Sequence, residues 1–350
     1  MKTNLAKTQI PEERLDELRE EALRTGRVRD SGIVPVSSPI TQPAWAASYH
    51  GHPVLKPPTW TWQIPLYFFV GGLAGTAAVI ALVAHISGSF PELRRAALWI
   101  AFAGALISPP LLIADLGLPS RFLNMLRVFK LRSAMSMGAW TLVAFSSSIG
   151  LAVVCSELVG AGYVYGSLVL LEWVAEVLAA LTGLILASYT SVLLGITAIP
   201  VWSENRKLLP AVFLAGGLGS AVAVLELAGF RLTATQLLGI AAASVETITA
   251  TIIEVRGKYV DRPLREGNVG WLMRTGAVLA GPVSLLLRIF WAHSAVGRQL
   301  AAISFLAGAL IGRYAWIAAG GVSSRDPQAL FKIQQSNKAR KGIAGESTRA

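Results

Sequence analysis

The 350-residue chain contains 53% hydrophobic residues but only 15% charged ones, whereas a soluble domain carries roughly 25% charged residues. This composition argues against a soluble domain and predicts an all-α integral membrane protein. The net charge of +11 would suggest nucleic acid binding in a soluble protein. In a membrane protein it indicates loop charges that fix the topology, so we expect a lipid bilayer and no nucleic acid as its surroundings.

The N-terminal segment 1–60 is polar and lacks the apolar stretch of a cleavable signal peptide. A short helical pattern from Glu12 to Arg24 precedes a proline-rich stretch, and proline at that density disfavours helix. Two interpretations stay open: a segment that lies extended along a partner surface, and a disordered tail.

Eight apolar runs follow, each near the ~20 residues that a helix needs to cross the hydrocarbon core. Tryptophans cluster at their ends, as is typical of membrane interfaces. The predicted spans are 64–87, 95–116, 138–159, 170–200, 208–229, 235–255, 270–292 and 298–319.

Two of these spans contain unusual features. Pro109 and Pro110 remove two helix donors from the second span, so we expect a kink or an interruption there. The fourth run is too long for one perpendicular span, so it either tilts or begins outside the lipid. In the second case Glu172 and Glu176 would contact water.

Loop charge predicts the orientation. One set of loops is strongly basic and lies on the same side as both tails, including the basic C-terminal tail 320–350. With an even number of spans, this bias places both termini in the cytoplasm, in a bacterial inner membrane. A large partner docked on a basic face would produce the same asymmetry.

The chain has few residues that ligate redox metals. His50 and His52 lie in the N-terminal tail, and His85 and His293 lie at span ends, so no pair is placed to hold a haem within the bilayer. The single cysteine, Cys155, cannot bind an iron–sulfur cluster or a structural zinc ion. We therefore expect no haem, no iron–sulfur cluster and no metal in this chain.

Ionisable residues inside spans are costly and are candidates for function. Asp115 closes the second span and is followed by Arg121, which is a possible partner. Tyr189 lies within the fourth span, where its phenol needs a hydrogen-bond partner, either a quinone carbonyl or a neighbouring helix. Glu226, Glu246 and Glu254 lie in the later spans, and they form either a proton path or interhelical ion pairs.

Three segments together resemble the NrfD/polysulfide reductase membrane-subunit family, which anchors molybdopterin oxidoreductases and exchanges electrons with quinone. These segments are 60–75, 115–129 and 189–202. Residues 48–58 also resemble the branch found beside formate-dehydrogenase-like subunits. The resemblance implies two four-helix bundles, at 61–204 and 205–319, with the quinone in the first.

The resemblance also implies a site. The start of the first span and the ends of the second and fourth lie on one face, so we expect a quinone pocket formed by Gln63, Tyr67, Asp115, Arg121 and Tyr189. Asp115 and Tyr189 are the predicted catalytic residues. Family members often carry an acid or a histidine near the position of Gln63, and this chain does not. Asp115 is therefore the favoured candidate for proton exchange with the quinone. A second departure is Ser191, where the family usually has glycine.

The predicted function is a quinone-binding subunit of a respiratory oxidoreductase complex. It would exchange electrons between a ferredoxin-like iron–sulfur subunit and menaquinone, or ubiquinone, with a molybdopterin catalytic subunit beyond. Two alternatives are a secondary transporter, which also suits buried charges and glycine-rich spans, and a purely structural membrane anchor.

Overall fold

A computed structural model describes residues 55–116, 122–127, 129–130 and 133–331. These residues all belong to one compact unit. The helical pattern at 12–24, most of the proline-rich tail, Arg121 and the tail beyond 331 lie outside the described residues.

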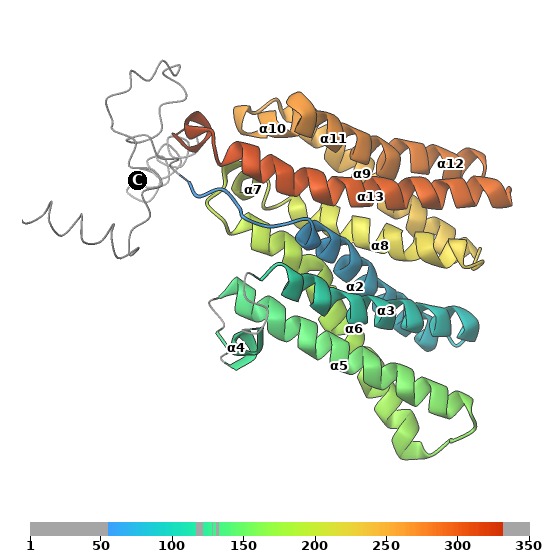
Figure 1. The fold of residues 1–350 in the computed structure, drawn as a ribbon. Helices are drawn as coiled ribbons and strands as arrows, with labels where there is room; N and C mark the ends of the chain where they lie inside the picture. The colour runs from blue at the N-terminus through green and yellow to red at the C-terminus, as the bar shows by residue number, and fades with distance from the viewer. Residues whose placement is uncertain (1–54, 117–121, 128, 131–132, 332–350) are drawn as a thin grey trace, which may run out of the picture. The chain divides into compact units, whose positions relative to one another are not determined.

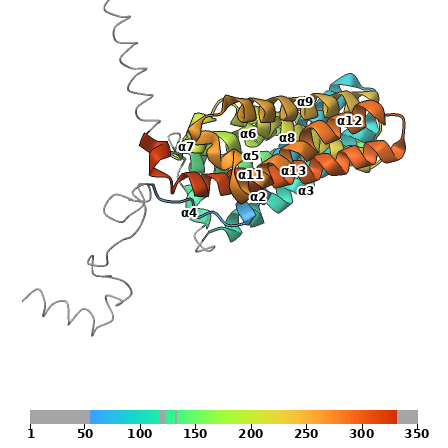
Figure 2. The same ribbon diagram turned by 90° about the horizontal axis from the view of Figure 1, so that it is seen from above.

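The described residues contain eight helices long and apolar enough to cross a membrane, so all eight predicted spans are confirmed and the protein is a multi-pass membrane protein. Figures 1 and 2 show these helices side by side. Their bounds are α2 (Gln63–Ser87), α3 (Pro91–Ala114), α5 (Ala134–Gly160), α6 (Gly166–Gly195), α8 (Leu209–Leu227), α9 (Thr233–Arg256), the composite α11–η4–α12 (Gly267–Phe290) and α13 (Ala295–Ser323).

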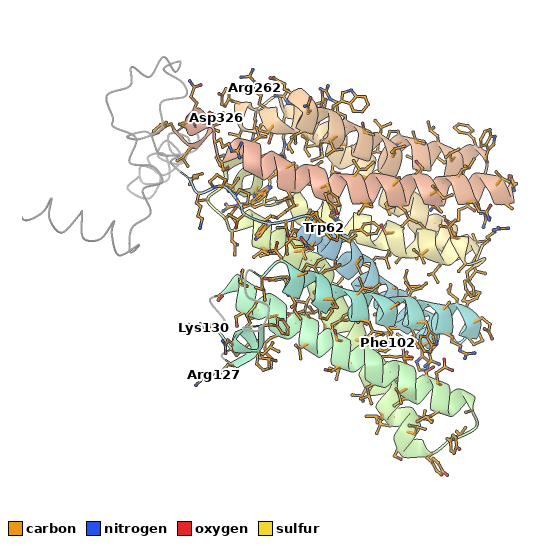
Figure 3. All side chains as sticks on the ribbon, viewed as in Figure 1. Trp62, Phe102, Arg127, Lys130, Arg262 and Asp326 are labelled. Carbon is orange, nitrogen blue, oxygen red and sulfur yellow. The ribbon has the colours of Figure 1, made fainter. Side chains whose placement is uncertain are left out.

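Four short elements lie between the long helices at one end of the molecule, which we call the basic face. They are α4 (Phe122–Arg127), α7 (Pro200–Glu204), η3 (Tyr259–Asp261) and α10 (Arg262–Arg265). Figure 3 shows Arg127, Lys130 and Arg262 at this end. The described cations of this face include Arg127, Lys130, Arg206, Lys207, Arg256, Lys258, Arg262, Arg265 and Arg325.

The helices pack in two groups of four. In the first group α2 packs on α3 and α6, and α5 packs on α3 and α6; in the second, α8, α9, α11–η4–α12 and α13 pack on one another. The groups meet where α2 contacts α8 and α13. The approach is close: a Cβ built on Gly217 would lie 2.8 Å from the carbonyl oxygen of Gly72, as small residues allow in membranes. The division at residues 204 and 205 stays a prediction.

Of the kink or interruption expected at the proline pair, the interruption does not occur, and the kink stays a prediction. Helix α3 continues through Pro109 and Pro110 to Ala114. Because Pro109 cannot donate to the carbonyl of Ala105, that oxygen is open to another donor, and the Ser146 hydroxyl of α5 approaches it at 3.5 Å. The irregularity instead lies in the seventh span, where a π-helical turn at Leu279–Val283 contains a proline.

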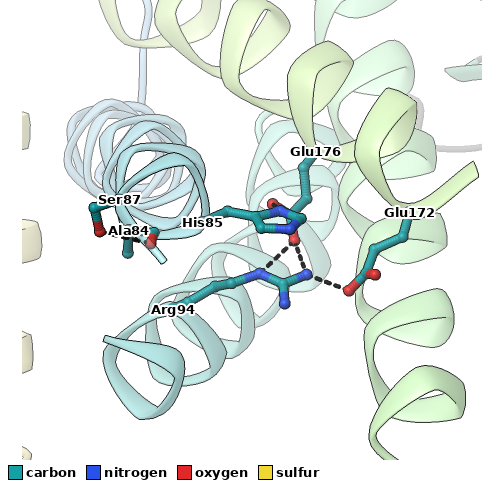
Figure 4. A network of polar contacts seen from close by, with 6 residues as sticks. All are labelled: Ala84, His85, Ser87, Arg94, Glu172 and Glu176. Atoms are coloured by element: carbon teal, nitrogen blue, oxygen red, sulfur yellow. Dashed lines mark hydrogen bonds and ion pairs between the residues drawn. The ribbon is translucent and has the colours of Figure 1, made fainter. Parts of the chain in front are cut away.

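Of the two alternatives for the fourth run, the one in which Glu172 and Glu176 contact water does not hold. Both are buried, with 3% and 1% of their surface exposed, at the end of the first group opposite the basic face. Arg94 of α3 lies between them, donating from Nε to Glu176 Oε1 at 2.8 Å and from Nη2 to Glu172. His85 Nδ1 lies 2.6 Å from Glu176 Oε2. Figure 4 shows this network joining α2, α3 and α6, and it satisfies charges that would otherwise be costly to bury.

Candidate functional site

A cavity of about 60 Å³ lies within the first group of helices, at the basic face. Its polar lining consists of the side chains of Tyr67, Asp115 and Tyr189, which come from α2, the end of α3, and α6. The remaining walls are apolar or aromatic: Trp60, Ile64, Phe68, Leu112, Leu116, Met125, Met135, Gly138, Ala139 and Leu193. A mostly apolar cavity with a few convergent polar groups is typical of a small-molecule site.

Asp115 is held in place by the segment that leads into α2. The backbone N–H of Thr61 donates to Asp115 Oδ1 at 2.9 Å, and the Thr61 hydroxyl lies against the same oxygen and against Gln63 Oε1. A hydroxyl has one proton and donates to one acceptor at a time. Among the described residues, no hydrogen bond engages Asp115 Oδ2, which leaves that oxygen for a proton or a ligand.

Tyr67 is nearly fully buried, with 3% of its surface exposed. Its ring is tilted against Phe68 at a centroid distance of 5.8 Å. Within the described part of the chain, no hydrogen bond involves its hydroxyl. Because Tyr67 lines the cavity and a phenol hydroxyl can donate one hydrogen bond, this side chain is suited to bond a ligand there.

Tyr189 is committed to a neighbouring helix. Its hydroxyl donates to the carbonyl oxygen of Ala134, in the first turn of α5. Gly138 makes this possible, because a Cβ at that position would lie 2.3 Å from ring atoms of Tyr189. The ring of Tyr189 therefore walls the cavity, and its hydroxyl closes the junction between α5 and α6.

An aromatic layer ties the cavity to the second group of helices. Trp60 stacks on Trp202 with centroids 5.5 Å apart and meets Phe68 edge-on at 6.2 Å. Trp202 is fully buried and donates from its indole nitrogen to the carbonyl oxygen of Trp316 at 2.8 Å. The Trp60 wall of the cavity is thus held, through Trp202, by helix α13 of the second group.

The structure brings together Tyr67, Asp115 and Tyr189 of the predicted pocket. Gln63 does not line the cavity but contacts Thr61, the residue that holds Asp115, and Arg121 lies outside the described residues. The sequence analysis did not single out Thr61. This residue lies between Trp60 and Trp62 in segment 60–75, and a lone threonine there does not indicate a contact with Asp115.

The three glutamates predicted for a proton path lie in the second group and differ in their surroundings. Glu226 accepts from Arg288 Nη1 at 2.8 Å, with both side chains buried. Glu254 accepts from Arg274 at 2.5 Å where both are about half exposed. Glu246 is buried and has no such direct partner among the described residues.

No cluster of three or more histidine, cysteine, aspartate or glutamate side chains suited to a metal ion occurs in the described ranges. Cys155 is free and buried, and His85 is engaged with Glu176. The cavity itself is lined by two phenols and one carboxyl group, which are hydrogen-bonding and protonatable.

Comparison with known proteins adds one finding. No curated protein matched the chain. A family model described as polysulfide reductase, of the NrfD type, matches residues 48–325, which is most of the chain and includes both groups of helices and the cavity. The chain therefore belongs to the NrfD-type polysulfide reductase family.

Proposed function

We propose that this protein is the quinone-binding membrane subunit of a multisubunit oxidoreductase, and that it exchanges electrons between a partner iron–sulfur subunit and menaquinone or ubiquinone. Its family consists of membrane subunits of redox enzyme complexes. The observation that carries the proposal is the cavity at the basic face, where Tyr67, Asp115 and Tyr189 meet in an otherwise apolar site.

The residue types that line the cavity suit a quinone head group, but the cavity volume is smaller than a quinone needs. Apolar walls suit the ring, and the unpartnered Tyr67 hydroxyl suits a carbonyl oxygen. The enclosed volume of about 60 Å³ is small beside the ~300–1,000 Å³ of pockets for drug-sized ligands. Binding therefore requires wall side chains to move, and Met125 and Met135 are unbranched and adaptable enough to do so.

Quinone chemistry couples two electrons to two protons. In this proposal Tyr67 donates a hydrogen bond that orients one carbonyl. Asp115 holds or releases a proton at Oδ2, while Thr61 fixes its other oxygen. Tyr189 keeps α5 and α6 together so that this geometry persists, and its bond to Ala134 gives it a positioning role. Trp60 and Phe68 exclude water from the apolar side.

The basic face is the proposed docking surface for the iron–sulfur subunit, with a molybdopterin subunit beyond it. The cavity lies at this face, so electrons that arrive there have a short path to the site. Large apolar side chains are exposed beside the cations Arg127 and Lys130, namely Leu123 and Phe129. Such a mixture of apolar and cationic groups suits a protein partner better than water.

The test is quinol-linked turnover of the intact complex with single variants. Asp115→Asn removes the protonatable oxygen, so turnover is expected to fall by about 10²-fold, the low end for acid–base catalysis. Tyr67→Phe removes one hydrogen bond of ~0.5–1.5 kcal/mol, so the KM for quinone should rise about 2–10-fold. Tyr165→Phe, exposed on the opposite face, is the matched control and should leave both parameters unchanged.

The rival functions give different results. A structural anchor predicts that Asp115→Asn and Tyr67→Phe turn over like Tyr165→Phe while the complex remains assembled. A secondary transporter predicts that the purified chain carries no redox subunits and moves a solute in vesicles. Either result would refute the proposal.

A further inference from the structure

A second, smaller cavity lies inside the second group of helices. It has a volume of about 30 Å³ and is lined from α8, α9, α11 and α13, with Glu246 and Arg313 as its ionisable residues. These side chains are 8% and 3% exposed, near the middle of α9 and α13. A charge at such depth costs several kcal/mol unless it is paired or solvated.

Glu246 and Arg313 do not contact each other directly. Arg313 Nη2 donates to the carbonyl oxygen of Phe213 at 2.9 Å, and its guanidinium lies 3.8 Å from the centroid of that ring. Arg313 Nε has no acceptor among the described groups. Elsewhere in this group Glu226 and Arg288 form a direct buried ion pair at 2.8 Å. The gap between Glu246 and Arg313 therefore differs from the way the chain pairs its other buried charges.

Gly216 of α8 shows that the two charged side chains lie close to the same point of the neighbouring helix. A Cβ built on this glycine would lie 2.7 Å from Arg313 Nη2 and 3.1 Å from Glu246 Oε1. A buried water needs ~10–15 Å³ and two to four polar partners. The cavity provides this volume, the carboxylate provides acceptors and the guanidinium provides donors, so water fits between them.

A groove adjoins this cavity on the side of the basic face. The groove, of about 320 Å³, runs between α9 and α11 and shares Ala250, Ile253, Met273 and Ala277 with the cavity. Its lining includes Glu254 and Arg274, which are about half exposed. Glu246, Ala250 and Glu254 are spaced four residues apart, so they follow one another along the same side of α9.

We propose that Glu246 is a proton-exchanging site: its carboxylate takes up a proton from water held beside Arg313 and returns it, with exchange along the α9–α11 groove to the basic face. The carboxylate becomes a carboxylic acid and Arg313 stays charged, so the site gains one positive charge. Two further ionisable pairs lie in this group of helices, and each is a direct pair: Glu226 with Arg288, and Glu254 with Arg274. The proposal does not depend on quinone binding.

Infrared difference spectroscopy between low and high pH tests the first half of this proposal, on the full chain in its complex. The wild type and Glu254→Gln should show a carboxylic acid band that Glu246→Gln lacks. Glu246→Asp keeps an acid but changes its surroundings, so it should shift the band, and this assigns the band even where Glu246→Gln folds poorly. A band that neither Glu246 variant alters overturns the proposal.

Hydrogen–deuterium exchange of the same band tests the route. Ala250→Leu adds three heavy atoms at the junction of cavity and groove, so exchange of the acid proton should slow about tenfold or more. Ala241→Leu is the matched control, because it is the same change on the same helix but lines a different groove. Equal exchange rates in Ala250→Leu, Ala241→Leu and the wild type would overturn the route along α9 and α11.

Discussion

Replacing Gly138 by alanine should disturb the candidate quinone site through one contact. The new Cβ would lie 2.3 Å from the Tyr189 ring, where ordinary contacts begin at 3.4 Å, so the ring or helix α5 must shift by about 1 Å. Overpacking of this kind costs about 1–3 kcal/mol. Losing the bond from Tyr189 to Ala134 adds ~0.5–1.5 kcal/mol, and the better helix propensity of alanine offsets at most ~1 kcal/mol.

The net expectation for Gly138→Ala is a destabilisation of about 0.5–4.5 kcal/mol, measured as a lower Tm of the detergent-solubilised complex, together with reduced quinol-linked turnover. Gly150→Ala is the matched control on the same helix, because its Cβ would meet Phe102 at an ordinary 3.6 Å. In a Tyr189→Ala background the cost of Gly138→Ala should largely disappear. Additive effects of Gly138→Ala and Tyr189→Ala would refute the reasoning.

Three further predictions concern the rest of the molecule. Arg288→Leu should destabilise the protein by ~3–5 kcal/mol, because it leaves Glu226 buried and unpaired; adding Glu226→Leu should recover much of the lost Tm. Gly75→Ala should impair assembly in the membrane, measured as yield of folded protein, since its Cβ would lie 2.1 Å from a carbonyl oxygen of α6. Burial raises the pKa of Asp261 above its ordinary 3.8 despite a hydrogen bond from Asn205. The protonated form is therefore favoured on folding, and stability falls as pH rises above that value; Asp261→Asn should remove this part of the pH dependence of the Tm.

The spans were predictable because each depends on a local property of the sequence. In lipid every backbone group must bond within its own segment, so an apolar run of sufficient length forms a helix. The first span, predicted at 64–87, is Gln63–Ser87, and the sixth, predicted at 235–255, is Thr233–Arg256. Glycines in spans are typical of close helix packing in membranes, but their positions do not indicate that Gly72 meets Gly217.

The partners of buried polar groups were not predictable, because they join residues far apart in the chain. Thr61 bonds Asp115 across 54 positions and His85 meets Glu176 across 91. Glu176 stands near the start of a long apolar run, where a wet helix end is the simpler interpretation. Only the packing of α2, α3 and α6 brings an arginine and a histidine to it.

The polar groups of the first four helices are concentrated at their two ends, and this has a consequence for protons. Between the cavity and the network at Glu176, the described core consists mainly of alanine, glycine and aliphatic side chains. The buried hydroxyls of this part donate to carbonyls of their own helices: Thr76 to Gly72 and Ser108 to Gly104. A proton relay needs groups that pass a proton from one to the next, and these hydroxyls are held within single turns. We therefore expect quinone protons to exchange at the basic face beside Asp115, and any proton movement deeper into the bilayer to use the second group of helices, where Glu246 borders a cavity large enough for water.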